Sequence, residues 1–318
     1  DQRHPGARRS RRGLDRARVV TRCPACDHEA EPRGAGRGAR AAGGGAARYG
    51  SSRESVAAVA IRVCPRCGHG WQAPLPDAAA LARRYAELED PRYVAETPRR
   101  RRSAARLRAL VAAGAPPRGP WLDVGCASGV FLDVVTAAGA EAWGVEPSAW
   151  LAEIARRGHG DRVRCAPLEG AALPAEAFGV VTLWDVLEHV PDPRGFLALA
   201  RRHLVPGGLL ALKVPARDSY VARALRGRWP LLLPEHLHYF TRPSLRALLR
   251  EAGLEAPSFR LHVVHFSLEY ALHRLAQHRW PLARRLHERV GGQRLGARAV
   301  PLLMGEVVAV ARRPAGTA

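Results

Sequence analysis

The sequence predicts an α/β protein with a doubly wound, mostly parallel sheet, preceded by a small cysteine-containing module. Two observations carry this prediction. From Pro120 onward, short apolar runs typical of strands alternate with helical segments, and such alternation produces a parallel sheet. Before Pro120, two Cys-x-x-Cys pairs flank a stretch rich in glycine, alanine and arginine. Right-handed crossovers then place a ligand site at the carboxyl ends of the strands.

Each element of the alternating region is predicted from an apolar run and from the capping residues, glycines and prolines that flank it. The expected strands are Trp121–Val124, Ala142–Glu146, Val163–Cys165, Val180–Trp184, Leu209–Val214, Leu261–Phe266 and Glu306–Ala311. The first expected helix is Val130–Ala138. Three further helices are expected to begin at the capping residues Ser148, Asp192 and Thr241, and to end at Gly158, Leu204 and Gly253, respectively. A helical insertion is expected around Tyr270–Arg289.

Shifts in composition divide the chain into four segments. We expect a disordered Arg-rich tail at 1–20, a zinc-binding module at 21–76, a helical cap or linker at 77–115 and an α/β domain at 116–318. Pro91 and Pro98 interrupt the helical segment, which predicts at least two helices there.

Charge and composition exclude several classes of protein. The 318 residues carry a net charge of +21, but Lys213 is the only lysine among the 50 basic residues. So strong a bias toward arginine, with 31 Gly and 25 Pro, indicates biased coding composition, and aromatic residues make up only 6%, so binding to nucleic acid is not expected. Without an apolar run of ~18 residues, no membrane span is expected. Paired cysteines indicate metal ligands in a reducing cytoplasm.

The most informative segment is the loop that follows the first predicted strand, Trp121-Leu-Asp-Val-Gly-Cys-Ala-Ser-Gly129. Gly125 and Gly129 allow a ligand to approach the backbone, and Glu146 ends the next strand, where it can accept bonds from ribose hydroxyls. A nicotinamide site would favour Gly-x-Gly-x-x-Gly instead. Asp123 beside the loop would repel a pyrophosphate but suits an ammonium or sulfonium group. The pattern therefore favours S-adenosyl-L-methionine.

Over Trp121–Val214 the chain resembles class I S-adenosylmethionine-dependent methyltransferases. The resemblance implies a Rossmann-like, mostly parallel seven-stranded sheet, with the loop holding the methionine part and the residues after the third strand bordering the adenine. Gly179 stands where the family often has Asp, and Ala127 where it often has Gly. The cofactor-binding residues that it implies are Asp123, Gly125, Cys126, Gly129, Glu146, Pro167, Leu168, Trp184 and Asp185. Cys126 and Cys165 lack an adjacent base and are expected to be buried.

The two cysteine pairs predict a structural zinc ion. Cys23, Cys26, Cys64 and Cys67 supply four thiolates, the set that closes a tetrahedral zinc site. A redox pair of the thioredoxin type is less favoured, because no β-α-β pattern surrounds either motif. A four-cysteine module ahead of a methyltransferase domain resembles the sugar C-methyltransferases of deoxysugar pathways.

That resemblance extends to Pro234-Glu-His-Leu-His-Tyr-Phe240, and it implies Glu235 and His236 at the reacting centre. The tyrosine that precedes this pair in those enzymes is replaced here by the stretch 231–234. His189, after the fourth strand, is a second candidate base, and His238 is a weaker one. Tyr85 and Tyr93 lie in the helical segment, which resembles the family's N-terminal cap over the cofactor. Hydrophobic docking against the sheet is the alternative role for both.

The sequence thus predicts a methyltransferase that uses S-adenosyl-L-methionine and a structural Zn²⁺ and acts on a small-molecule acceptor. C-methylation of a nucleotide-linked sugar or a secondary metabolite is the first expectation. O-methylation of a quinone-like or polyketide-like hydroxyl is the alternative. A zinc-ribbon protein that modifies RNA is the alternative of another class, and it would bind RNA with a steep dependence on salt.

Overall fold

The structure is a computed structural model, and it describes residues 21–30, 33–34, 61–269, 271–272, 281–293, 295–296 and 298–316. The predicted tail at 1–20 lies outside the described residues. So do residues 31–32 and 35–60, which include most of the Gly-rich stretch Glu31–Gly50, and part of the expected insertion after 269.

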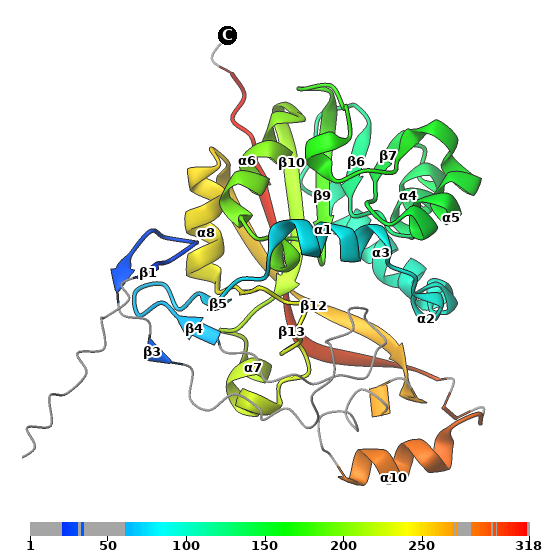
Figure 1. The fold of residues 1–318 in the computed structure, drawn as a ribbon. Helices are drawn as coiled ribbons and strands as arrows, with labels where there is room; N and C mark the ends of the chain where they lie inside the picture. The colour runs from blue at the N-terminus through cyan, green and yellow to red at the C-terminus, as the bar shows by residue number, and fades with distance from the viewer. Residues whose placement is uncertain are drawn as a thin grey trace, which may run out of the picture.

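A seven-stranded sheet forms the centre of the molecule, in the order β12-β13-β10-β9-β6-β7-β8 (Figure 1). Only β13 runs antiparallel to its neighbours β10 and β12, so the predicted mostly parallel, Rossmann-like sheet is confirmed. The strands are β6 (Trp121–Val124), β7 (Ala142–Val145), β8 (Val163–Arg164), β9 (Phe178–Trp184), β10 (Leu204–Pro215), β12 (Glu255–Ser267) and β13 (Ala299–Arg312).

Helices cover both faces of this sheet because its central strands are apolar on both sides. In β9, Val181 and Leu183 face one buried cluster, whereas Val180 faces the other. The first cluster includes apolar residues of α6 (Pro193–Arg202) and α8 (Arg242–Glu251). The second includes residues of α3 (Thr97–Ala112), α4 (Val130–Ala137) and α5 (Ala149–His159). Residues alternate between the faces as the two-residue period of a strand requires.

The predicted strands and helices of the central region lie in the predicted order, but three strands are much longer than expected. β10 has 12 residues and begins at Leu204, which was predicted to end the preceding helix; that helix ends at Arg202. β12 has 13 residues and β13 has 14, where six-residue strands were predicted. Pro257 lies where the register of β12 shifts, and Pro301 pairs within the ribbon. Prolines are atypical of strands, which hid the extensions from the sequence pattern. A second prediction was wrong as well: Cys165 is exposed, because it lies just beyond the end of the edge strand β8.

The segment before β6 contains three helices: α1 (Ala78–Ala86), α2 (Pro91–Ala95) and α3. Pro91 and Pro98 lie in the first turns of α2 and α3, where a missing N–H costs no hydrogen bond. The two prolines therefore separate the segment into helices, as predicted. None of the helices that the structure describes is long and apolar enough to cross a membrane.

Two small sheets lie at the N-terminal end. β1 (Thr21–Arg22) pairs with β2 (Glu29–Ala30). A second sheet has the order β11-β5-β4-β3, in which β3 (Arg33–Gly34), β4 (Ile61–Val63) and β5 (Gly70–Gln72) come from the N-terminal part. β11 (His238–Tyr239) comes from the chain after β10, so the two parts of the protein share one sheet.

Side chains reinforce this junction. The Gln72 amide donates hydrogen bonds to the backbone carbonyls of Pro234 (2.7 Å) and His236 (2.9 Å). The Thr241 hydroxyl donates to the carbonyl of Cys67 at 2.6 Å. The chain around the second cysteine pair is therefore hydrogen-bonded directly to the segment that precedes α8.

Candidate functional site

The loop between β6 and α4 is held in a tight, left-handed path. Gly125 and Gly129 have φ values of +75° and +82°, and Ala127 has +47°. A Cβ on Gly125 would lie 2.6 Å from a methyl group of Val186, so only glycine fits. Gly129 precedes α4, whose first backbone N–H groups have no partner within the helix. The loop is thus shaped for the close approach of a ligand at the carboxyl end of β6.

Glu146 closes this loop from the neighbouring strand. Its carboxylate accepts hydrogen bonds from the backbone N–H of Ala127 (2.9 Å) and of Ser148 (2.8 Å). The residue is 6% exposed, and burial raises its pKa to about 7, although the two backbone hydrogen bonds partly oppose the shift. Each oxygen that is fixed in this way still has a lone pair for a hydroxyl of a ligand.

Asp123 is the second buried carboxylate at this edge. The Thr182 hydroxyl donates a hydrogen bond of 2.6 Å to its Oδ1. Burial raises the pKa of Asp123 to about 7, the Thr182 bond lowers it, and the nearby charge of Glu146 adds to the rise. Two carboxylates whose ionised forms are unfavourable in the ligand-free protein favour a ligand that carries positive charge.

The remaining predicted cofactor residues lie around the same edge. Cys126 is buried under the loop, and Leu168 packs into the core in the short turn that follows Pro167. The Trp184 ring meets Phe131 edge-on at 5.3 Å.

Asp185, the first residue after β9, is exposed and has a φ of +58°. Its carboxylate forms an ion pair of 2.7 Å with the ammonium group of Lys213, which lies on β10. A residue other than glycine in this conformation is held there by its surroundings, and such strain concentrates at functional sites.

His189 and His236, which are 47 residues apart, lie side by side. His189 ends the short turn Leu187–His189 after β9, and His236 lies two residues before β11. Their ring centroids are 4.9 Å apart and the rings are nearly perpendicular. His189 Nδ1 is 2.9 Å from the carbonyl oxygen of Glu235, and His236 Nδ1 is 2.9 Å from that of Leu231. Desolvation lowers the pKa of His189, which favours its neutral form.

The other predicted candidates are placed differently. Glu235 contacts the pair through its main-chain carbonyl. His238 faces the N-terminal module instead, where its Nδ1 is 3.1 Å from Nε2 of His69.

The sequence placed Tyr85 in the helical cap but did not predict its contact with the histidine pair: its hydroxyl, on α1, is 2.9 Å from His189 Nδ1. Tyr93 carries the guanidinium of Arg100 over its ring at 3.6 Å. Burial raises the pKa of Tyr93 and the charge of Arg100 lowers it. The carboxylates of Asp185, Glu146 and Asp123 raise it further. Both tyrosines thus belong to the surroundings of the carboxyl edge, and only their position on a helical segment ahead of the sheet pointed to this.

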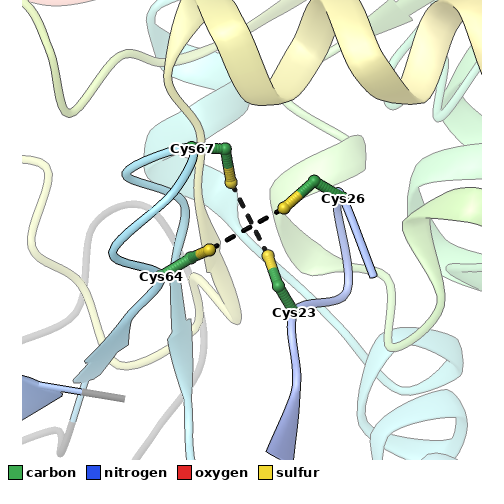
Figure 2. A group of neighbouring side chains, drawn as sticks. All are labelled: Cys23, Cys26, Cys64 and Cys67. Atoms are coloured by element: carbon green, nitrogen blue, oxygen red, sulfur yellow. Dashed lines mark hydrogen bonds between the residues drawn. The ribbon is translucent and has the colours of Figure 1, made fainter. Parts of the chain in front are cut away.

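The four cysteines of the two pairs converge, as Figure 2 shows. Their sulfur atoms all lie within 4.8 Å of one another, and the Cys23–Cys67 and Cys26–Cys64 sulfurs are each 3.7 Å apart. Zinc–sulfur bonds of ~2.3 Å in a tetrahedral site place the sulfur atoms about 3.8 Å apart. The group therefore has the dimensions of a four-thiolate zinc site.

The two cysteine pairs have the same local geometry. The backbone N–H of Asp27 donates to the carbonyl of Cys23, and that of Gly68 donates to the carbonyl of Cys64. Asp27 and Gly68 both have positive φ, at +55° and +72°. Each turn thereby directs both of its sulfurs to one side.

Comparison with known proteins identifies the family. The profile of the methyltransferase domain family matches residues 97–258. The chain belongs to this methyltransferase family. The ubiquinone biosynthesis O-methyltransferase of Thiobacillus denitrificans is 34% identical over 148 residues, which cover 42% of this chain and 63% of that protein. The protein of the same name from Xanthomonas axonopodis is 31% identical over 205 residues, 58% of this chain and 81% of that one.

This chain therefore spans less than two thirds of the length of the Thiobacillus denitrificans protein. Solved structures of methyltransferases are more distant. The 1,6-didemethyltoxoflavin-N1-methyltransferase of Burkholderia thailandensis has 19% identity and a TM-score of 0.46, covering 81% of this chain and 97% of its own. A methyltransferase of Archaeoglobus fulgidus has 17% identity and a TM-score of 0.48, with coverage of 70% and 100%.

The two buried carboxylates predict a specific pH dependence of stability. Because the folded-state pKa values of Asp123 and Glu146 are raised to about 7, the folded protein binds protons more tightly there than the unfolded chain does. Their contribution to the free energy of unfolding should therefore rise as the pH falls through 7, by on the order of 1 kcal/mol for each group. Urea denaturation of the ligand-free protein at about pH 6 and about pH 8 measures it.

The combined variant Asp123→Asn, Glu146→Gln isolates this contribution from those of other groups. It should respond less to this pH change than the parent protein. An identical pH response in the two proteins would contradict the raised pKa values.

Proposed function

We propose that this methyltransferase uses S-adenosyl-L-methionine to methylate a small-molecule acceptor. The observation that carries the proposal is the carboxylate of Glu146, buried at the end of β7 and held against the loop after β6. A carboxylate in this position suits the ribose hydroxyls of the cofactor. Asp123, beside the same loop, offers negative charge for the methionine ammonium and the sulfonium.

Methyl transfer is a displacement in line at carbon. A lone pair of the acceptor attacks the methyl carbon, the carbon–sulfur bond breaks with its electrons going to sulfur, and S-adenosylhomocysteine leaves. A hydroxyl acceptor also loses its proton, so the protein must position the two reactants and receive or release that proton. His189 and His236 support this role, because a neutral imidazole can receive a proton at about pH 7, and Nδ1 of each ring is held 2.9 Å from a carbonyl oxygen.

A hydroxyl group is the first choice of acceptor. The two relatives described above are named O-methyltransferases of ubiquinone biosynthesis. C-methylation of a nucleotide-linked sugar is the second candidate. It is favoured by the four-cysteine module, which shares a sheet with the chain immediately after Glu235 and His236.

The cysteine group is proposed to hold one structural Zn²⁺, with no direct part in methyl transfer. Its sulfur spacing fits the ion, as described above. When bound, the ion would fix the two turns against each other and so stabilise the N-terminal module.

Cofactor binding is tested by the variant Glu146→Gln. The amide leaves one oxygen and presents N–H donors to hydroxyl groups, so the affinity for S-adenosylhomocysteine should fall by about 10- to 100-fold, the equivalent of ~1–3 kcal/mol. Isothermal titration calorimetry measures the affinity. The matched control is Glu153→Gln, on the exposed side of α5, and it should bind like the parent. Equal affinity in all three proteins would refute the assignment of Glu146.

The zinc proposal is tested by metal analysis of the purified protein, which should give about one zinc per chain. Cys23→Ser removes one thiolate, so the variant should lose the metal and melt at a lower temperature. The control Cys165→Ser changes an exposed cysteine outside the group and should keep both metal and melting temperature. Zinc-free parent protein with an unchanged melting curve would contradict a structural site.

The reaction is tested with cofactor that carries a deuterated methyl group and a panel of hydroxylated aromatic compounds and nucleotide-linked keto sugars. Mass spectrometry detects the labelled product, and its NMR spectrum distinguishes O-methyl from C-methyl. With the identified acceptor, His236→Ala should lower single-turnover methyl transfer by ~10²–10⁴-fold while cofactor affinity stays nearly unchanged. Full turnover in both His236→Ala and His189→Ala would contradict the role of the pair.

A further inference from the structure

The only lysine of the chain is buried at the carboxyl edge of the sheet. Lys213 is 7% exposed, although lysine is among the residues that proteins bury least. It lies on β10, in register with Trp184 of β9 and with Val308 of β13. Residues in register lie on the same face of a sheet, and Val308 belongs to the buried cluster that includes residues of α3, α4 and α5. The side chain of Lys213 therefore lies on this face, beside the last residue of β9.

Lys213 binds the residue that follows β9 through both its side chain and its main chain. The ammonium group is 2.7 Å from Oδ2 of Asp185, and the Lys213 carbonyl accepts a hydrogen bond of 3.0 Å from the Asp185 N–H. Asp185 has a φ of +58°, a conformation that is unfavourable for a residue other than glycine and persists only where the surroundings fix it. One residue of β10 thus fixes the path of the chain as it leaves β9.

Glu306 joins the same ammonium group to a third strand. Its Oε1 is 3.4 Å from Nζ of Lys213, and it lies two residues before Val308 on β13, on the same face of the sheet. Burial lowers the pKa of Lys213, but the carboxylates of Asp185 and Glu306 more than offset this and raise it above its usual value. The amine is therefore protonated at neutral pH and cannot act as a base. Instead it links the ends of β9, β10 and β13.

This link bears on His189, because Asp185 comes two residues before the turn that carries it. Burial lowers the pKa of His189, whereas the hydrogen bond to the Glu235 carbonyl and the charge of Asp185 raise it. The other groups that contact the His189 ring are the Tyr85 hydroxyl of α1 and the ring of His236. Asp185 is thus the group through which Lys213 can act on the histidine pair.

The position suits lysine better than arginine. Lys213 is the only lysine among 50 basic residues, so a chain strongly biased toward arginine has the shorter cation here. An ammonium group is compact and can direct its N–H donors to several sides, whereas a guanidinium group is larger, planar and rigid. A compact group fits between two carboxylates that come from opposite neighbours of β10. The shape of the cation, as well as its charge, therefore matters at this position.

We propose that Lys213 is a positioning residue for methyl transfer, which fixes Asp185 and thereby the place and the charge environment of His189. The inference rests on the function proposed above, in which the histidine pair receives the proton of the acceptor. The ammonium group limits the effect of the Asp185 charge on the imidazole, so His189 stays neutral. A histidine that is already protonated cannot receive a proton from the acceptor.

The first test removes the ammonium group and measures the titration of His189. Lys213→Met leaves the charge of Asp185 uncompensated, so His189 should gain its proton at a higher pH than in the parent protein. Nuclear magnetic resonance of the full chain with isotope-labelled histidine measures this without cofactor or acceptor, and His189→Asn identifies the signal. The matched control is Arg242→Met, which removes a cation from an ion pair of 3.3 Å with Asp218, and it should titrate like the parent.

A second test separates the position of Asp185 from the charge of the lysine. Lys213→Arg keeps the charge, and it replaces Lys213→Met if that variant does not fold. With the identified acceptor, both variants should lower single-turnover methyl transfer by about 10-fold or more, because small misplacements of reacting groups are costly. Adding Asp185→Asn to Lys213→Met should cause no loss beyond the larger single loss, because the lysine acts through Asp185. Affinity for S-adenosylhomocysteine should change little in Lys213→Met and Lys213→Arg.

Three results would overturn the proposal. They are an unchanged titration of His189 in Lys213→Met, a shift of equal size in Arg242→Met, and full methyl transfer in Lys213→Arg. Additive losses in the double variant would show that the lysine does not act through Asp185, and they would overturn it as well. A shifted titration of His189 in a protein that binds no cofactor would refute the proposed function and leave the link between Lys213 and His189 standing.

Discussion

One buried carboxylate holds the carboxyl edge of the sheet together. Glu146 accepts from the backbone N–H of Ala127 in the loop after β6 and from that of Ser148, the cap of α5. A single side chain therefore fixes two loops on neighbouring strands. Its burial makes the ionised form unfavourable, and two hydrogen bonds offset only part of that cost. A ligand with hydroxyl donors or positive charge would stabilise the ionised carboxylate further.

A second constraint comes from the N-terminal module. β5 pairs with β11, and the Gln72 amide donates to the carbonyls of Pro234 and His236. These contacts fix the chain that carries His236, and Glu188 meets the same chain where the Leu237 N–H donates to its carbonyl. The histidine pair is thus positioned between the end of a central strand and a small sheet that is joined to the cysteine group. The Zn²⁺ proposed for the cysteine group would therefore affect the site only indirectly, through the packing of that sheet.

Much of this was predictable from the sequence because it depends on local pattern. The strand–loop–helix unit from Trp121 to Ala137 follows from an apolar run and two glycines, and the cysteine pairs follow from their spacing. What the sequence did not predict depends on contacts between distant segments. The Tyr85 hydroxyl contacts His189, which is 104 residues away, and Trp71 of β5 pairs with His238 of β11, which is 167 residues away. The sequence also did not predict that Oε2 of Glu188 is buried without a hydrogen-bond partner among the described residues, because burial depends on the packing of several segments.

The central claim is that the edge around Glu146 binds the cofactor with its reactive sulfur toward the histidine pair. A crystal structure of the protein with S-adenosylhomocysteine tests this most directly. The account predicts that the ribose hydroxyls donate to the Glu146 carboxylate at about 2.6–3.0 Å, with the sulfur on the side of His189 and His236. A nucleoside bound elsewhere, or a ribose without contact to Glu146, would contradict it.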